Sequence, residues 1–405
     1  MLAGTRMLAG IGGGRTVSRL ERMQLLRLLI LLLSAVRAQT AAAMQEPAAD
    51  RLTVVSAETS AGTVKITGRV LVSGDPGWLV EDRAGRLTQI PAAAVRGTEV
   101  LDTAWVPLEV AEMSGVLKDS AGAGFEVTES EHFLICSDCS EDYNEFCGKL
   151  LDKVFEEYFE LMEDLQVAVK RPAALLPVLI FSNAGRFQSY AGALHPEVSF
   201  ADTPGFYTVR DNQILLQDFT READLRGQAA IRGKLAKQPL QVATMVHETV
   251  HQLAFNSGLQ VRFADNPVWF SEGLALFFEQ TSVRSGLLWT RPGLVNERHH
   301  PTFAMLTQSG RLPIGLQQLS EDDTVFSAGE TAAAAYAQSW AIMTWLIRRE
   351  QQAFRDYVSN LQQLQPLKKV PAADRTQRLL DCLPNQGEGA EQDLIRMITR
   401  LRVSR

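Results

Sequence analysis

The chain has 405 residues, of which 46% are hydrophobic and 21% charged, and its formal net charge is −7. This length corresponds to about two domains, and the composition is ordinary for a soluble globular protein. The acidic balance argues against nucleic acid or an anionic membrane surface as a partner.

Residues 1–38 are predicted to be a secretory signal peptide. Arginines precede or enter an apolar run at 25–33, and residues 36–38 place small side chains at positions −3 and −1 of a cleavage before Gln39. The run is interrupted by Arg27 and is too short to span a bilayer, so we expect no stable membrane insertion after cleavage. The segment carries six Arg and one Glu, so the mature chain has a net charge of −12. We therefore expect an exported protein, in the periplasm, on the cell surface or secreted.

The region 51–112 is predicted to be a small all-β domain, preceded by a linker at 39–50. Turn signals at 73–77 and 82–85 separate its short apolar runs. The predicted strands are 52–55, 62–71, 77–81 and 87–90. Because the region contains neither His nor Cys, we expect it to bind a partner, dock on the next domain or act as a spacer.

A second linker is predicted at 113–124, and an α+β domain at 125–365. Strand and helix patterns follow one another in the first half of this domain. The predicted elements are strands at 125–128, 132–136 and 176–181, a long amphipathic helix at 142–165, a short helix around Phe187 and Tyr190, and a hairpin of strands 205–209 and 213–217.

The segment 242–255 has apolar residues at helical spacing and contains His-Glu-x-x-His. His247 and His251 are four residues apart, so they project from one face of the predicted helix and can occupy two corners of a zinc tetrahedron. Glu248 stands beside them without being a ligand. This is the position of a general base that takes a proton from a metal-bound water.

A third ligand is predicted in the next apolar segment, 267–279. Pro267 ends the preceding segment, Ser271 is the expected N-cap of a second helix, and Glu272 then lies in its first turn. An unpaired carboxylate among apolar neighbours is costly, so a metal is its natural partner. The metzincin pattern is excluded because Ala254 and Ser257 stand where that pattern has Gly and His.

Together the two segments resemble the gluzincin signature of zinc peptidases: His247-Glu248-x-x-His251, then Trp269-x-x-Glu272-Gly273-x-Ala275. The wider sequence at 251–259, 267–275 and 336–341 resembles secreted bacterial proteins with a peptidase-MA-like domain of unknown function. This resemblance extends over about 131–364.

The resemblance implies a zincin-like fold and a zinc-dependent peptidase acting on a peptide or protein substrate. Zn²⁺ is expected on His247, His251 and Glu272, with Glu248 as the general base. In such a fold an edge strand borders the cleft and can add an extended peptide, and the 205–217 hairpin is the candidate for that edge.

The predicted helix at 332–349 carries Tyr336. Aminopeptidase-type gluzincins place a tyrosine on a helix beyond the glutamate ligand, where it donates a hydrogen bond to the developing oxyanion, so the resemblance makes Tyr336 a candidate catalytic residue. The alternative is a packed core tyrosine. His299 and His300 are expected in a solvated loop, with oxyanion stabilisation as the alternative role.

The chain continues with a predicted helix at 354–364 and a C-terminal helical tail at 366–405 that holds one helix, at 391–401. The four cysteines allow three full disulfide pairings, and their irregular spacing argues against a four-cysteine zinc site. They are Cys136, Cys139, Cys147 and Cys382. Structural thiols or disulfides are therefore expected.

Three functions fit these residues. A zinc endopeptidase is preferred over an exopeptidase, because no Gly-Ala-Met-Glu-Asn-type motif indicates recognition of a free amino terminus. A catalytically inactive zincin-like binding module is the first alternative, against which the intact Glu248 argues. A zinc hydrolase of a non-peptide amide or ester is the second.

Overall fold

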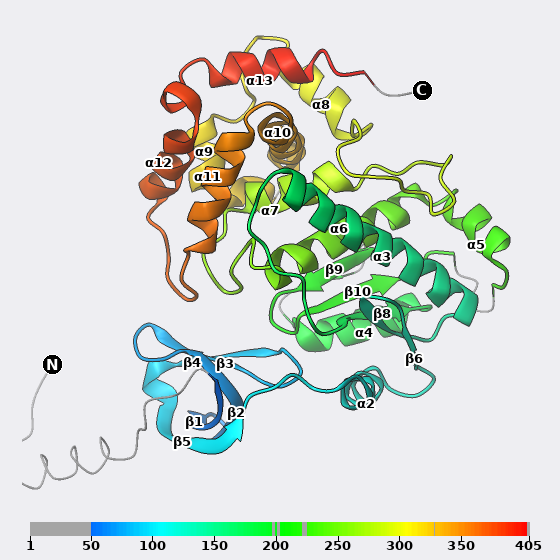
Figure 1. Cartoon of the computed structure of the whole chain (residues 1–405), viewed down its shortest axis with the longest axis vertical. Helices are drawn as coiled ribbons and strands as arrows, with labels where there is room; N and C mark the ends of the chain where they lie inside the picture. Colours follow the sequence, from blue (N-terminus) through cyan, green and yellow to red (C-terminus); the bar gives the residue numbers. More distant parts are fainter. Residues whose placement is uncertain (1–49, 197–198, 201–202, 221–224, 328, 403–405) are drawn as a thin grey trace, which may run out of the picture.

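The computed structural model describes residues 50–402 except 197–198, 201–202, 221–224 and 328 (Figure 1). The predicted signal peptide, and all of the predicted linker at 39–50 but its last residue, lie outside this range. The described chain has a β-rich N-terminal region followed by helices packed with a mixed sheet, so the α+β class is confirmed. None of the described helices is both long and apolar enough to cross a membrane.

The N-terminal region forms a five-stranded antiparallel sheet with the order β4-β3-β2-β1-β5. Its strands are β1 (Arg51–Thr59), β2 (Gly62–Val72), β3 (Gly77–Glu81), β4 (Leu87–Pro91) and β5 (Val95–Ala104). Four of them match the predicted strands. The sequence did not reveal β5, because this edge strand buries only Thr98 and so lacks an alternating apolar pattern.

The predicted linker at 113–124 is wrong, because most of this segment is helix α2 (Val110–Ala121). A capping box between Glu109 and Glu112 starts the helix. Its two buried residues, Met113 and Leu117, pack against the second sheet. The few apolar residues of this segment stand among Ser, Gly and Ala, and their period was too weak to predict a helix.

The second sheet is mixed, with the order β6-β7-β8-β10-β9. Its parallel centre is flanked by antiparallel strands on both sides. The strands are β6 (Glu126–Glu129), β7 (Phe133–Ser137), β8 (Leu176–Phe181), β9 (Gly205–Thr208) and β10 (Gln213–Gln217). These confirm the predicted strands and the hairpin, and they place β9 at an edge of the sheet.

Helices cover both faces of this sheet, as the alternation of its buried side chains requires. On β7, Phe133 and Ile135 join the core formed with α3 (Glu141–Asp164) and α6 (Pro239–Asn256). Their neighbour Leu134 joins the opposite core, with α2 and α4 (Ala184–Leu194). The long helix α3 and the short helix α4 were both predicted.

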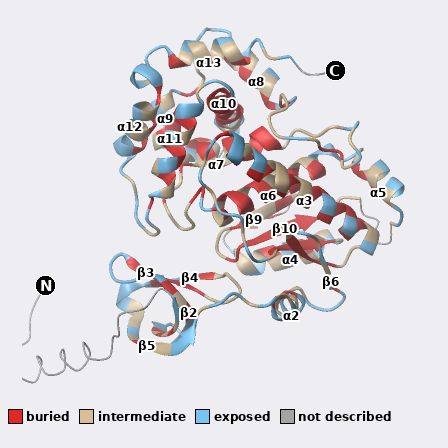
Figure 2. Cartoon of the chain, viewed as in Figure 1, coloured by how far each residue is buried: buried red, intermediate tan, exposed pale blue. Residues whose placement is uncertain are grey.

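The described chain after β10 is mainly helical, and its C-terminal helices pack around α10, which is largely buried (Figure 2). The further helices are α5 (Gln228–Leu235), α7 (Val268–Phe278), α8 (His299–Leu306), α9 (Leu316–Glu321), α10 (Gly329–Arg348), α11 (Gln351–Gln362), α12 (Ala372–Cys382) and α13 (Ala390–Ile398). The region 366–405 thus holds two helices rather than one. Leu379, Leu394 and Ile398 of these helices belong to the main core, so the segment is part of the domain and not an appended tail.

Arg262 joins the two sheets. Its guanidinium donates hydrogen bonds to the carbonyl oxygens of Gly85 (2.9 Å), Val209 (2.6 Å) and Arg210 (3.0 Å). The Leu87 N–H at the start of β4 also donates to the Arg210 carbonyl, at 2.8 Å. The N-terminal sheet is therefore docked on the β9–β10 turn.

A buried ion-pair network ties α12 to the segment before α7. The Asp265 carboxylate accepts hydrogen bonds from Lys369, the Val370 N–H and Arg375, and Arg375 also pairs with Asp323. Burial works to raise the pKa of Asp265, but these donors outweigh it and hold the pKa below its ordinary value.

The sign of this shift predicts an acid-sensitive contribution to stability. Asp265 stabilises the fold above its ordinary pKa of 3.8, and this contribution is lost as the pH falls through the lower folded-state pKa. Asp265→Asn is expected to unfold more easily at pH 7, by roughly 2–4 kcal/mol, because it leaves buried Arg375 less well paired. It should also lose less stability than wild type as the pH falls from about 4 toward 2. Denaturant unfolding across this range measures both effects, and parallel pH profiles would contradict the assignment.

Candidate metal centre

Helix α6 places the His-Glu-x-x-His motif on its one open side. Pro239 occupies the first turn, and the apolar residues Val242, Met245, Val246 and Val250 are buried in the main core. The predicted helix is confirmed. His247 and His251 keep 15% and 13% of their side chains exposed, so the pair is largely enclosed but reachable from one direction.

Helix α7 brings Glu272 to the same place, although it begins earlier than predicted. Its N-cap is Pro267 and not Ser271, and Glu272 lies in the second turn rather than the first. Ser271 instead accepts a hydrogen bond from Gln260, at 2.7 Å. The fixed φ of proline favours the earlier start, so the apolar run is helical from Val268 on.

The three predicted ligands converge. Glu272 Oε2 lies 3.3 Å from His247 Nε2, and Glu272 Oε1 lies 3.6 Å from His251 Nε2. The three donor groups lie within 4.8 Å of one another. Donors bound to one zinc at about 2.0–2.2 Å in tetrahedral geometry are roughly 3.3–3.6 Å apart. These donor types and spacings therefore fit a zinc ion, which His247, His251 and Glu272 would hold.

Glu279, at the C-cap of α7, orients the first ligand. Its Oε2 lies 3.0 Å from His247 Nδ1, and its Oε1 accepts a hydrogen bond from Asn296 at 2.9 Å. In the tautomer with its proton on Nδ1, His247 donates a hydrogen bond to Glu279. Its Nε2, which faces Glu272, then carries a free lone pair. Such a carboxylate–histidine pair fixes the tautomer and the ring orientation of a metal ligand.

The electrostatics of the cluster favour a cation. Glu248, Glu272 and Glu279 gather here, and within the described chain the ion pairs of Glu272 and Glu279 are with histidines, not with Lys or Arg. Burial opposes a charge on His247, yet the two carboxylates beside its nitrogens raise its pKa well above the ordinary value. Burial lowers the pKa of His251 to about 4, which keeps that imidazole neutral and able to bind a metal.

Glu248 lies beside the ligands and is held by the edge strand. Its Oε2 accepts a hydrogen bond from the Tyr207 N–H on β9, at 2.8 Å. Burial raises the pKa of Glu248 to about 7, against the opposing charge of His247. A carboxylate with this pKa can take up and release a proton near neutral pH.

Tyr336 of α10 is half-buried, and its ring packs edge-on against Phe326, with ring centres 5.2 Å apart. Burial raises the pKa of Tyr336 to about 12, and the negative charges of Glu272 and Glu248 add to the rise. The structure thus brings His247, His251 and Glu272 together with Glu248 beside them, and Tyr336 experiences the charge of this cluster.

The sequence did not identify two groups of the site, Glu279 and the Tyr207 N–H, and the expected position of His299 was wrong. Glu279 is seven residues after Glu272, which puts both on one face of α7, and this spacing could have identified it. The Tyr207 N–H carried no signal because it is a backbone group. His299 was expected in a solvated loop, but it is buried at the start of α8, with its Nε2 3.7 Å from Glu279.

Two further groups of residues are of types that bind metals, and neither resembles the cluster at Glu272. All four cysteines are free thiols in the structure, and Cys136 and Cys147 are buried. Glu131, His132 and Glu156 also lie close together. There Glu156 forms a bidentate pair with Arg171 and contacts His132 at 2.7 Å, so this surface cluster is already charge-balanced.

Residues 241–368, about a third of the chain, match a family described as Protein of unknown function (DUF1570). The matched segment includes His247, Glu248, His251, Glu272 and Tyr336. No curated protein matches the chain. The similarity therefore covers the three candidate ligands and Glu248 but not Tyr207, and the family description assigns no activity.

Removing the carboxylate behind His247 tests the geometry of the centre. Glu279→Ala is expected to weaken zinc binding by about 10–100-fold, because the imidazole loses the group that fixes its orientation. Glu279→Gln keeps a hydrogen-bond acceptor for Nδ1 and should lose less. Competition with a zinc-binding dye measures both constants, and equal affinity in wild type and Glu279→Ala would contradict the assigned role.

Proposed function

We propose that this protein is a zinc-dependent peptidase with a zincin-like catalytic domain of the gluzincin type. The observation that carries the proposal is the convergence of His247, His251 and Glu272, with Glu248 held alongside by an edge strand. The mechanism needs a metal and a base that contact the same water. Loss of His247, His251 or Glu272 would remove the metal site, and loss of Glu248 would remove the base.

A zinc ion bound at this centre supplies positive charge that lowers the pKa of a water and polarises a carbonyl. Glu248 takes the proton of the attacking water. Its Oε2 is occupied by the Tyr207 N–H, so we assign the proton to Oε1. The same carboxyl group then delivers the proton to the leaving amine. The Tyr336 hydroxyl donates a hydrogen bond to the oxyanion that develops on the scissile carbonyl.

The free edge of β9 favours a peptide substrate. The Tyr207 N–H is directed to Glu248 and away from β10, so the Tyr207 carbonyl faces the same free edge. An extended peptide can pair with such an edge and bring its scissile bond beside Glu248. We therefore prefer an endopeptidase over a hydrolase of a non-peptide amide or ester, which has no use for this edge.

A catalytically inactive binding module is the alternative. Glu248 argues against it, because a carboxylate that lies beside the candidate ligands without binding the metal serves no purpose in metal retention. Export of the mature chain, with peptide or protein substrates outside the cytoplasm, belongs to the same proposal and rests on residues 1–38 of the sequence.

The proposed role of Glu248 separates chemistry from metal binding. Glu248→Gln is expected to retain one zinc per chain and to lower the rate of peptide hydrolysis by about 10²–10⁴-fold, because only the base is removed. A proteome-derived peptide mixture, digested and analysed by mass spectrometry, gives the rate and the cleavage sites. Equal cleavage by wild type and Glu248→Gln would contradict the mechanism, and no cleavage by zinc-loaded wild type would contradict the proposed activity.

A further inference from the structure

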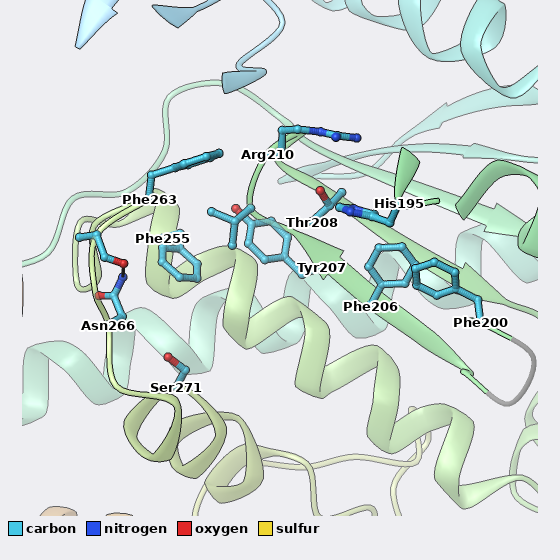
Figure 3. A pocket seen from close by; sticks show the side chains of 12 residues that line it. His195, Phe200, Phe206, Tyr207, Thr208, Arg210, Phe255, Phe263, Asn266 and Ser271 are labelled. Atoms are coloured by element: carbon cyan, nitrogen blue, oxygen red, sulfur yellow. Dashed lines mark hydrogen bonds between the residues drawn. The ribbon is translucent and has the colours of Figure 1, made fainter. Parts of the chain in front are cut away.

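A cavity of about 610 Å³ opens beside β9 (Figure 3). Phe206, Tyr207 and Thr208, three consecutive residues of this strand, all line it. Successive side chains of a strand point to opposite faces, so a cavity that touches all three extends along the outer edge of the strand. β10 pairs with the other edge, and the cavity therefore lies where an added peptide strand would lie.

The elements that form the candidate metal centre also border the cavity. The Tyr207 backbone holds Glu248, Phe255 follows His251 by one helical turn on α6, and Ser271 directly precedes Glu272. Each element that supplies a ligand or the base thus also supplies a wall of the cavity. A peptide with its scissile bond at Glu248 has side chains within reach of this space.

The lining is mainly aromatic. The rings of Phe200 and Phe206 are stacked with centres 4.7 Å apart, and those of Tyr207 and Phe255 are stacked at 5.8 Å. Phe263 lies across from them (Figure 3). Rings presented in this way favour another ring or a bulky apolar group over a small side chain.

Two polar side chains in the lining, Arg210 and Tyr207, are bound to other parts of the protein. Arg210 pairs with Asp211 and donates to the Leu194 carbonyl, and the Tyr207 hydroxyl donates to Asn212. The charged side chain in this lining, Arg210, is itself a cation, so a cationic ligand group would lose its hydration here without gaining an ionic partner. The cavity therefore selects against positively charged side chains.

We propose that this aromatic pocket, lined by Phe200, Phe206, Tyr207, Phe255 and Phe263, binds a bulky apolar side chain, preferentially an aromatic one, of a peptide extended along β9. The volume exceeds that of any one side chain and also accommodates the adjoining peptide backbone. The inference rests on the proposed function only for its link to cleavage. The binding preference itself follows from the lining.

Binding is tested without turnover, on the full chain. The probes are N-acetyl-phenylalaninamide and N-acetyl-alaninamide, titrated and followed by ligand-observed NMR. The phenylalanine probe is expected to bind at least about tenfold more tightly, because it buries a ring that the alanine probe lacks. Equal affinity of the two probes would overturn the proposal.

Variants locate the binding. Phe255→Lys places a cation in the wall of the pocket and is expected to remove the preference for the phenylalanine probe. Phe255→Ala adds no charge, and it should weaken the binding of the phenylalanine probe about tenfold. Met305→Lys is the matched control, since it makes the same charge change at an exposed position on α8. An unchanged preference in folded Phe255→Ala would overturn the assignment to this pocket.

The link to cleavage is a separate measurement. Among cleavage sites in a proteome-derived peptide mixture, one fixed position near the scissile bond should be enriched in Phe, Tyr, Trp, Leu or Met, and Phe255→Lys should remove this enrichment. Cleavage with no such position overturns the pocket as a subsite. Probe binding without any cleavage supports the pocket and contradicts the proposed peptidase function.

Discussion

The candidate centre depends on the distance between two helices. Glu272 on α7 must reach two imidazoles on α6, and its oxygens lie 3.3 and 3.6 Å from them. Packing behind the site sets that distance. Gly273 on α7 lies against α10 so closely that a Cβ there would come within 2.7 Å of the Ser339 carbonyl oxygen. Gly273, directly after the candidate ligand Glu272, is therefore needed for packing. Trp269 is fully buried and packs against Tyr357.

The edge strand is fixed at two points, and both matter for the site. The Tyr207 N–H is bound by Glu248, and the Val209 carbonyl just beyond β9 is bound by Arg262. Because Arg262 also binds the Gly85 carbonyl, the N-terminal sheet supports the strand along which we place the substrate. The N-terminal region thus has a structural relation to the cleft, although it carries none of the ligands.

Apolar periodicity and motif spacing in the sequence predicted most of the strands and helices and the candidate ligands. The period of α6 and the His-Glu-x-x-His spacing gave the helix and its open side, and the alternating runs gave nine of the ten strands. Helix α2 and strand β5 were missed because neither has a strong apolar period: α2 buries two residues and β5 one. The start of α7 was misplaced because Ser271 is a good N-cap by type but is held by Gln260 instead.

Contacts between residues that are far apart in the sequence could be identified only from the folded structure. The bond from Tyr207 to Glu248 joins residues 41 positions apart, and the burial of His299 against Glu279 arises only when α8 packs near α7. Such contacts leave no local signal in one sequence. The central claim is a zinc ion on His247, His251 and Glu272, and metal analysis of the purified chain tests it most directly. One zinc per chain that is lost in Glu272→Ala is the predicted result, and a wild-type chain that stays metal-free after zinc is supplied would contradict the claim.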